Sequence, residues 1–426
     1  MPLTATRPSH PPTLRTFTPA LILLALSVFI NYIDRGNLSI AASTIKDELH
    51  ISASQLGGLL SAFFWTYTAM QFVVGWLVDR FDVNRVLAAG FVLWSLATAA
   101  TGLVHGIVLL LVMRMILGVG ESVAFPCSSK ILARHLPEHH RGLANGVVSG
   151  SLKFGPAVGT LGAGLLMARY GWRPVFIGIG LISLLWLPAW AKWRPRGPGL
   201  ARPVAARSGY IAILTSRSFW GAAAGHFSSN YLLYLSVTWL PFYLQRERHL
   251  SLQSMTRVAS AYFLVDALAC LSTGAIADFF IRRGHSPTRV RKSAMALGHA
   301  TAAIALLGLA FAGPDNYLPW MLAVGAGSGI SGAGVFAFAQ TLAGPETAGR
   351  WVGLQNGFAN FAGVLCPALT GRLVDKTGNF TAAFAIAAAL MLLGGFAWVF
   401  GVGRLEQATP AGNTEPSQQL IYAEPV

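Results

Sequence analysis

Charged residues are scarce in this chain, and that scarcity excludes most soluble folds. Only 11% of the 426 residues are Asp, Glu, Lys or Arg, whereas 54% are hydrophobic. A soluble globular domain usually carries about 25% charged residues. The composition therefore predicts a protein that crosses a membrane many times rather than one with a large soluble core.

Cysteine and acidic residues are also few. The three cysteines, Cys127, Cys270 and Cys366, stand singly in apolar stretches without a CxxC spacing, which argues against a disulfide framework. With 31 basic and 16 acidic residues, the formal net charge is +15. The basic residues lie in short loops between apolar runs rather than on one polar face, so we expect no nucleic-acid partner.

Long apolar runs, in contrast, are abundant. A span of about 20 residues crosses the hydrocarbon core, and it must be helical because lipid offers no partner to backbone groups. We predict an all-α membrane protein whose twelve transmembrane helices form two pseudo-symmetric six-helix bundles. The predicted spans are residues 18–40, 55–77, 86–104, 107–131, 142–167, 174–192, 219–244, 255–281, 292–313, 317–342, 350–373 and 380–402.

Loop charge predicts the orientation of these spans. If both termini are cytoplasmic, 20 of the 31 Lys and Arg residues lie inside, 8 lie outside and 3 lie within spans, as expected from the positive-inside rule. We therefore expect an inner-membrane protein, most simply a monomer, with a first span that is retained rather than cleaved as a signal peptide. The predicted parts are a cytoplasmic tail (1–17), a first bundle (18–192), a basic cytoplasmic loop (193–218), a second bundle (219–402) and a disordered cytoplasmic tail (403–426).

The two halves repeat short patterns at matching positions. Residues 75–79 read GWLVD and residues 274–278 read GAIAD, and the Asn-Gly pairs at 145–146 and 356–357 each precede a proline by the same spacing. Internal repeats of this kind are typical of secondary transporters.

These motifs carry a resemblance to a known family. Residues 75–85, GWLVDRFDVNR, resemble the loop motif G-x-L-x-D-R-x-G-R of the major facilitator superfamily, with Asp82 in place of glycine. Within it the chain is similar to the anion:cation symporters, which include bacterial galactonate, glucarate and hexuronate carriers and, more distantly, sialin and vesicular glutamate transporters. The similarity lies in residues 31–39 (NYIDRGNLS), 114–126 (RMILGVGESVAFP), 238–241 (TWLP) and 360–367 (NFAGVLCP). It implies alternating access between two bundles and transport of an organic anion.

Six formal charges lie within the predicted spans away from the span ends, where a charge is costly and usually faces a wet interior. Three are basic and three acidic, so the set is neutral, and a bound monoanion would favour protonation of one carboxylate. The hypothesis is proton-coupled symport, with protons as the coupling ion and no other cofactor. Its proton sites are Glu121, Asp34 and Asp266, its anion contacts are Arg35 and Lys153, and Arg114 tunes the carboxylates.

Spacing relates several of these charges. Arg114 and Glu121 are seven residues apart, so a helix presents both on nearly one face about 10 Å apart. The neighbours Asp34 and Arg35 point about 100° apart, which leaves Arg35 as a bidentate clamp for a carboxylate and Asp34 facing another partner such as Arg114. For Lys153 two alternatives stay open, since it either contacts substrate or serves as a counter-charge.

Neutral polar side chains within the spans suggest a hydroxylated ligand. The candidates are Tyr32, Tyr67, Tyr231, Tyr234, Gln340, Asn356 and Asn360, the last matching the family's Asn-x-Ala-Gly pattern. A cytoplasmic gate is expected at Asp79, Arg80, Arg85 and Asp278.

One further pattern does not indicate a site. Residues 327–332 spell G-x-G-x-x-G inside an apolar span, without the strand that a dinucleotide site needs. No metal site and no enzymatic constellation stand out. We therefore predict uptake of a sugar acid (an aldonate, uronate or aldarate) with protons, and exchange or export of another small carboxylate is the alternative.

Overall fold

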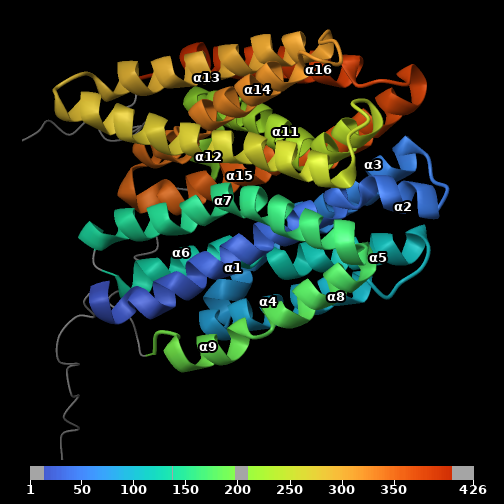
Figure 1. The fold of residues 1–426 in the computed structure, drawn as a ribbon. Helices are drawn as coiled ribbons and strands as arrows, with labels where there is room; N and C mark the ends of the chain where they lie inside the picture. Colours follow the sequence, from blue (N-terminus) through green and yellow to red (C-terminus); the bar gives the residue numbers. More distant parts are fainter. Residues whose placement is uncertain (1–13, 137, 197–209, 405–426) are drawn as a thin grey trace, which may run out of the picture.

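The computed structural model describes residues 14–136, 138–196 and 210–404. Within these ranges all regular secondary structure is helical, so the all-α prediction is confirmed (Figure 1). Each of the twelve predicted spans overlaps helical segments.

The first bundle comprises the helices that lie together in the lower half of Figure 1. They are α1 (Leu14–Ile40), α2 (Ala42–Glu48), α3 (Ala53–Arg80), α4 (Val83–Thr101), α5 (Ile107–Glu121), α6 (Ala124–His135), α7 (Glu138–Tyr170), α8 (Trp172–Ser183) and α9 (Trp186–Trp193).

The second bundle lies above it. Its helices are α11 (Arg217–Arg246), α12 (Leu252–Arg282), α13 (Pro287–Ala310), α14 (Tyr317–Gly332), α15 (Val335–Thr377), α16 (Thr381–Phe396) and the π-helix η1 (Ala397–Gly401). The short helix α10 (Tyr210–Leu214) lies within the predicted inter-bundle loop.

Local sequence signals explain where several helices begin. The Ser52 side chain accepts from the Gln55 amide while the Gln55 side chain accepts from the Ser52 amide, a reciprocal cap that starts α3. Asp82 accepts from the backbone N–H of Arg85 at 2.9 Å and so caps α4. Asp82, which replaces the glycine of the family motif, therefore caps the start of α4.

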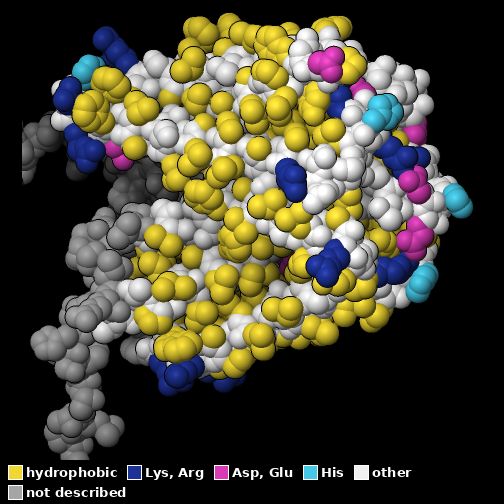
Figure 2. All heavy atoms as spheres, viewed as in Figure 1, with side chains coloured by type: hydrophobic (Ala, Val, Ile, Leu, Met, Phe, Trp, Pro, Cys, Tyr) yellow, Lys and Arg dark blue, Asp and Glu magenta, His cyan; other side chains and the backbone are white. Residues whose placement is uncertain are grey.

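Eight helical segments of the described chain are long and apolar enough to cross a membrane. Helices α3, α7 and α11 have 28, 33 and 30 residues and are also long enough to span a bilayer, but they carry more polar side chains. Figure 2 shows hydrophobic side chains across the middle of the molecule, with most charged side chains nearer its two ends. This distribution fits a multi-pass membrane protein.

The two bundles meet through α3 against α15, α7 against α12, and α11 against α1 and α2. Glycine permits the closest approach: a Cβ built on Gly57 would lie 2.4 Å from the Pro367 carbonyl oxygen, and one on Gly371 would lie 2.4 Å from that of Ala53. Small residues at such contacts let helix backbones pack directly in a membrane. The interface is therefore tight where α3 meets α15.

The closed part of this interface lies at one end of the molecule. We call the end where α1 begins and η1 ends the terminal face, and the other end the opposite face (Figure 1). At the opposite face, Asp375 of α15 accepts from the amides of Ala53 and Ser54 at 2.8 and 2.7 Å, and Arg246 of α11 pairs with Asp47 of α2. The described conformation is thus closed at the opposite face.

Candidate functional site

A buried ion pair joins α1 to α5 in the first bundle. The Arg35 Nε atom lies 2.9 Å from Glu121 Oε2, and the two residues are only 3% and 1% exposed. The sequence analysis predicted both as functional residues on separate spans. The structure brings them into direct contact.

Aromatic rings surround the Arg35 guanidinium. Its central carbon lies 4.6, 5.0 and 4.4 Å from the ring centres of Tyr32, Phe63 and Tyr67, respectively. One guanidinium nitrogen, Nη1, donates to the Tyr32 hydroxyl at 3.4 Å. Cation–π contacts stabilise a desolvated guanidinium and leave it positively charged.

Arg114 and Asp34 complete this cluster of charges. The Arg114 guanidinium carbon lies 5.1 Å from the centre of the Phe63 ring, and Arg114 interacts electrostatically with Glu121 and Asp34. The Asn37 side chain donates to Asp34 Oδ1 at 3.3 Å. Two cations and two carboxylates therefore share one buried region of the first bundle.

Several hydrogen-bonding atoms of these charged groups have no partner among the described residues. They are Asp34 Oδ2, Arg35 Nη2, Arg114 Nε and Glu121 Oε1. An unpartnered buried polar atom costs about 1–3 kcal/mol. The cluster therefore keeps hydrogen-bonding capacity that the described side chains do not use.

The second bundle contributes polar groups to the same region. Tyr234 of α11 donates its hydroxyl proton to the side-chain oxygen of Asn360, and the Asn360 amide donates to the Asn356 carbonyl at 2.8 Å. The Tyr234 ring lies 4.3 Å from that of Phe64 on α3, and Tyr234 interacts electrostatically with Arg35. The aromatic and electrostatic contacts of Tyr234 therefore link this polar group of the second bundle to the first bundle.

A second ion pair crosses this interface. Lys153 Nζ on α7 lies 3.0 and 3.3 Å from the two carboxylate oxygens of Asp266 on α12. The Lys153 side chain is 16% exposed and that of Asp266 is 5% exposed. Of the alternatives left open by the sequence, the counter-charge contact is present in this conformation.

The remaining predicted residues lie apart from the cluster or outside the described part. Tyr231 is buried one turn from Tyr234 within the second bundle, beside the Phe227 ring. Asn356 contributes its backbone carbonyl. The side chains of Gln340 and Asp79 lie outside the described residues.

The other predicted gate residues lie on the surface of the terminal face. Arg80, Arg85 and Asp278 are exposed, and no ion pair among the described side chains joins them. Their role as a gate stays a prediction, because the terminal face is not the closed one in this conformation.

Sequence reasoning missed Phe63, which stacks against both arginines. The signal was present, since Phe63 and the predicted Tyr67 are four residues apart and share one helix face. Their rings lie 5.3 Å apart. Hydrophobicity alone does not separate such a residue from ordinary core.

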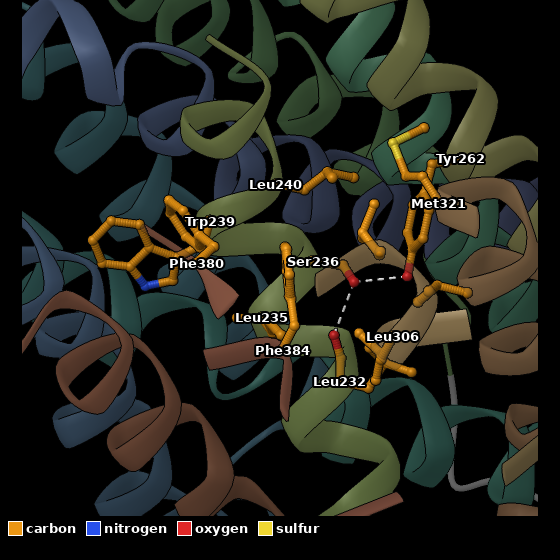
Figure 3. A pocket seen from close by; sticks show the side chains of 12 residues that line it. Leu232, Leu235, Ser236, Trp239, Leu240, Tyr262, Leu306, Met321, Phe380 and Phe384 are labelled. Atoms are coloured by element: carbon orange, nitrogen blue, oxygen red, sulfur yellow. Dashed lines mark hydrogen bonds between the residues drawn. The ribbon is translucent and has the colours of Figure 1, made fainter. Parts of the chain in front are cut away.

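A cavity inside the second bundle is a separate feature. Figure 3 shows it among α11, α12, α13, α14 and α16, where the Ser236 hydroxyl lies 2.7 Å from that of Tyr262 and donates to the Leu232 carbonyl at 2.9 Å. Its volume is about 20 Å³ and most of its lining is apolar. This space suits about one water molecule rather than a sugar acid.

Comparisons with known proteins agree with this architecture. The family model described as Major Facilitator Superfamily matches residues 24–363 and 288–422. The hexuronate transporter of Bacillus subtilis (strain 168) is 29% identical over 435 residues, covering 95% of this chain and 98% of that protein. The probable galactarate/D-glucarate transporter of Escherichia coli (strain K12) is 28% identical over 422 residues, covering 91% and 95%. Among solved structures, the D-xylose-proton symporter has a TM-score of 0.75 at 15% identity and covers 92% of this chain and 99% of that one.

Proposed function

Because this chain belongs to the major facilitator superfamily and is a membrane transporter, we propose that it takes up a small organic anion, most simply a sugar acid, together with protons. Alternating access between its two bundles would carry the substrate across the membrane. No covalent chemistry and no cofactor is required, since binding, proton transfer and rocking of the bundles suffice.

One observation carries the proposal. The Arg35–Glu121 pair is buried, is 2.9 Å long and retains an unpartnered atom on each side chain. A planar guanidinium binds a carboxylate in two hydrogen bonds, so a substrate carboxylate competes with Glu121 for Arg35. A carboxylate that loses its cation in a buried site gains a proton more readily.

Charge balance links substrate binding at Arg35 to protonation of Glu121. The groups Asp34, Arg35, Arg114 and Glu121 sum to zero when ionised, and a bound monoanion would make the cluster −1. Protonation of Glu121 restores neutrality, because excess charge is costly in a low-dielectric region. Asp34 is a further candidate proton site, and Arg114, which interacts with both carboxylates, influences which of them binds a proton first.

The polar groups opposite Arg35 support a hydroxylated substrate. The Tyr234–Asn360 hydrogen bond and the Tyr67 ring supply donors, acceptors and a flat face near the guanidinium. Two of the related transporters are described by their names as carriers of hexuronate and of galactarate or D-glucarate. Both are sugar acids, which is the substrate class we assign to this chain.

The conformation fits one half of a transport cycle. The opposite face is closed by Asp375 and by the Arg246–Asp47 pair, so the site would communicate with the terminal face. If that face is cytoplasmic, as loop charge predicts, this is the state from which substrate is released into the cell.

The test is uptake by proteoliposomes under an imposed inward proton gradient, with labelled D-glucuronate as substrate. The wild-type protein should accumulate substrate above the external concentration without any internal counter-substrate. Glu121→Gln should abolish accumulation, because the exchanged side chain cannot gain and lose a proton. As a matched control, Asp315→Asn replaces an exposed carboxylate and should change uptake by less than about twofold.

The outcomes separate the proposal from its alternative. Accumulation by Glu121→Gln equal to that of the wild type would exclude Glu121 as the proton site. Uptake that occurs only when vesicles are preloaded with a carboxylate would instead indicate an exchanger. A Glu121→Asp variant keeps a proton-binding group and shows whether loss of activity reflects charge or packing.

A further inference from the structure

The Lys153–Asp266 pair joins two helices that belong to different bundles, and its ammonium reaches into the second bundle. Besides its 3.0 and 3.3 Å contacts with Asp266 on α12, Lys153 Nζ lies so near α14 that a Cβ built on Gly332 would be 3.1 Å from it. The Lys153 ammonium is therefore held by a carboxylate of the other bundle.

This pair lies at the boundary of the closed part of the α7–α12 interface. Toward the opposite face, the Ser260 hydroxyl donates to the Ala157 carbonyl at 2.7 Å, and Gly164 packs directly on Thr256. Toward the terminal face, no hydrogen bond between the described parts of α7 and α12 lies beyond the pair. Lys153 and Asp266 therefore form the hydrogen-bonded contact that lies nearest the terminal face between the described parts of these two helices.

The pair also lies near the Arg35 cluster. A Cβ built on Gly155, two residues after Lys153, would lie 2.8 Å from Tyr32 Cβ, and the Tyr32 ring stacks on Arg35 at 4.6 Å. Tyr32 interacts electrostatically with both Arg35 and Lys153. Two cations, each neutralised by a carboxylate of the protein, thus border the same tyrosine.

We propose that Lys153 is the second anion-binding residue and that the substrate is a dianion, such as an aldarate, with an acidic group at each end. This inference rests on the proposed function of the Arg35 site and names its substrate class. One carboxylate of the substrate replaces Glu121 on Arg35, and the other replaces Asp266 on Lys153. A monoanion satisfies Arg35 alone and leaves the Lys153–Asp266 pair intact.

Displacement at Lys153 has two consequences. A dianion bound with both protein carboxylates ionised makes the site −2, and protonation of Glu121 and Asp266 returns it to zero, so two protons accompany each substrate. When the substrate displaces the Asp266 carboxylate from Lys153, an ion pair between the two bundles is also broken. Binding of the correct substrate therefore weakens the inter-bundle contact that must separate during rocking.

The test compares D-glucarate with D-gluconate, which have the same six carbons and differ by one carboxylate. In proteoliposomes the wild type should transport glucarate with the lower KM. Lys153→Gln should raise the KM for glucarate at least about tenfold, because a charge-assisted hydrogen bond is lost, and change that for gluconate by less than about threefold. Asp266→Asn, which removes the competing carboxylate, should tighten glucarate binding.

Folding of each variant is checked by its elution as a single species and by its melting temperature. The neutral pair Lys153→Met with Asp266→Leu keeps the contact apolar and leaves no unpaired buried charge, and it should raise the KM for glucarate more than the KM for gluconate. Equal effects of Lys153→Gln on both compounds would overturn the inference and make Lys153 a structural counter-charge. Wild-type uptake of gluconate but not glucarate also overturns it and leaves the proposed function standing, whereas uptake of neither compound and of no D-glucuronate refutes the sugar-acid function itself.

Discussion

Gly57 offers the sharpest test of how the opposite face closes. A Cβ added there would lie 2.4 Å from the Pro367 carbonyl oxygen and 3.3 Å from Gly371 Cα, both of them backbone atoms of α15 that cannot rotate away. Gly57→Ala must therefore push α3 and α15 apart. Overpacking of this kind costs about 1–3 kcal/mol.

That cost applies only to the state with the opposite face closed, because the two helices separate there when the face opens. A free-energy difference of about 1–3 kcal/mol changes a two-state ratio about 5- to 150-fold. Gly57→Ala should thus shift the population toward opening at the opposite face and slow transport. The neighbouring Gly58→Ala is the matched control, since its added Cβ meets nothing within 4 Å and changes helix propensity by the same amount.

The measurement is the distance between spin labels on the exposed positions His105 and Lys376, one on each bundle at the opposite face, after replacement of the native cysteines. The wild type and Gly58→Ala should give one short distance, and Gly57→Ala should gain a longer one. Identical distance distributions for all three proteins would refute the assignment of α3 and α15 as the closing contact.

Three further predictions follow from other contacts. Asp375→Ala should lengthen the same label distance, because the first two amides of α3 lose their acceptors across the interface, and it should act in the same direction as Gly57→Ala. Phe63→Leu should weaken substrate binding several-fold with little change in melting temperature, as measured by isothermal titration, because one ring stacks on both arginines of the site. The Arg173 hydrogen bond lowers the pKa of Glu48 below its ordinary value of 4.5. This ion pair therefore stabilises the fold above pH 4.5, and the stabilisation is lost as the pH falls through the lowered pKa. The melting temperatures of wild type and Glu48→Gln should differ at pH 7 and converge in acid.

The helices were largely predictable because hydrophobic length and loop charge determine them. The predicted span 219–244 corresponds to α11, Arg217–Arg246, and 255–281 to α12, Leu252–Arg282. The interruptions between α5 and α6 and between α8 and α9 were not predicted, since both occur within continuous apolar runs. A short break in a helix does not change the hydropathy of the surrounding sequence.

The candidate site was predictable residue by residue but not as a set of contacts. Charges within apolar spans identified Arg35, Glu121, Lys153 and Asp266. Which carboxylate pairs with which cation depends on the rotation of each helix and on packing between distant segments, and these are absent from local sequence. For the same reason Phe63 escaped notice, because an aromatic residue that holds arginine looks like any other core phenylalanine.

The cap that Asp375 places on α3 has a consequence for observing the protein at work. The amides of Ala53 and Ser54 find their acceptors only on the other bundle, so their protection from solvent depends on how the two halves are arranged. Hydrogen exchange at these two amides would therefore report how often the opposite face opens, without any label, and a substrate that drives the cycle should change their exchange rates.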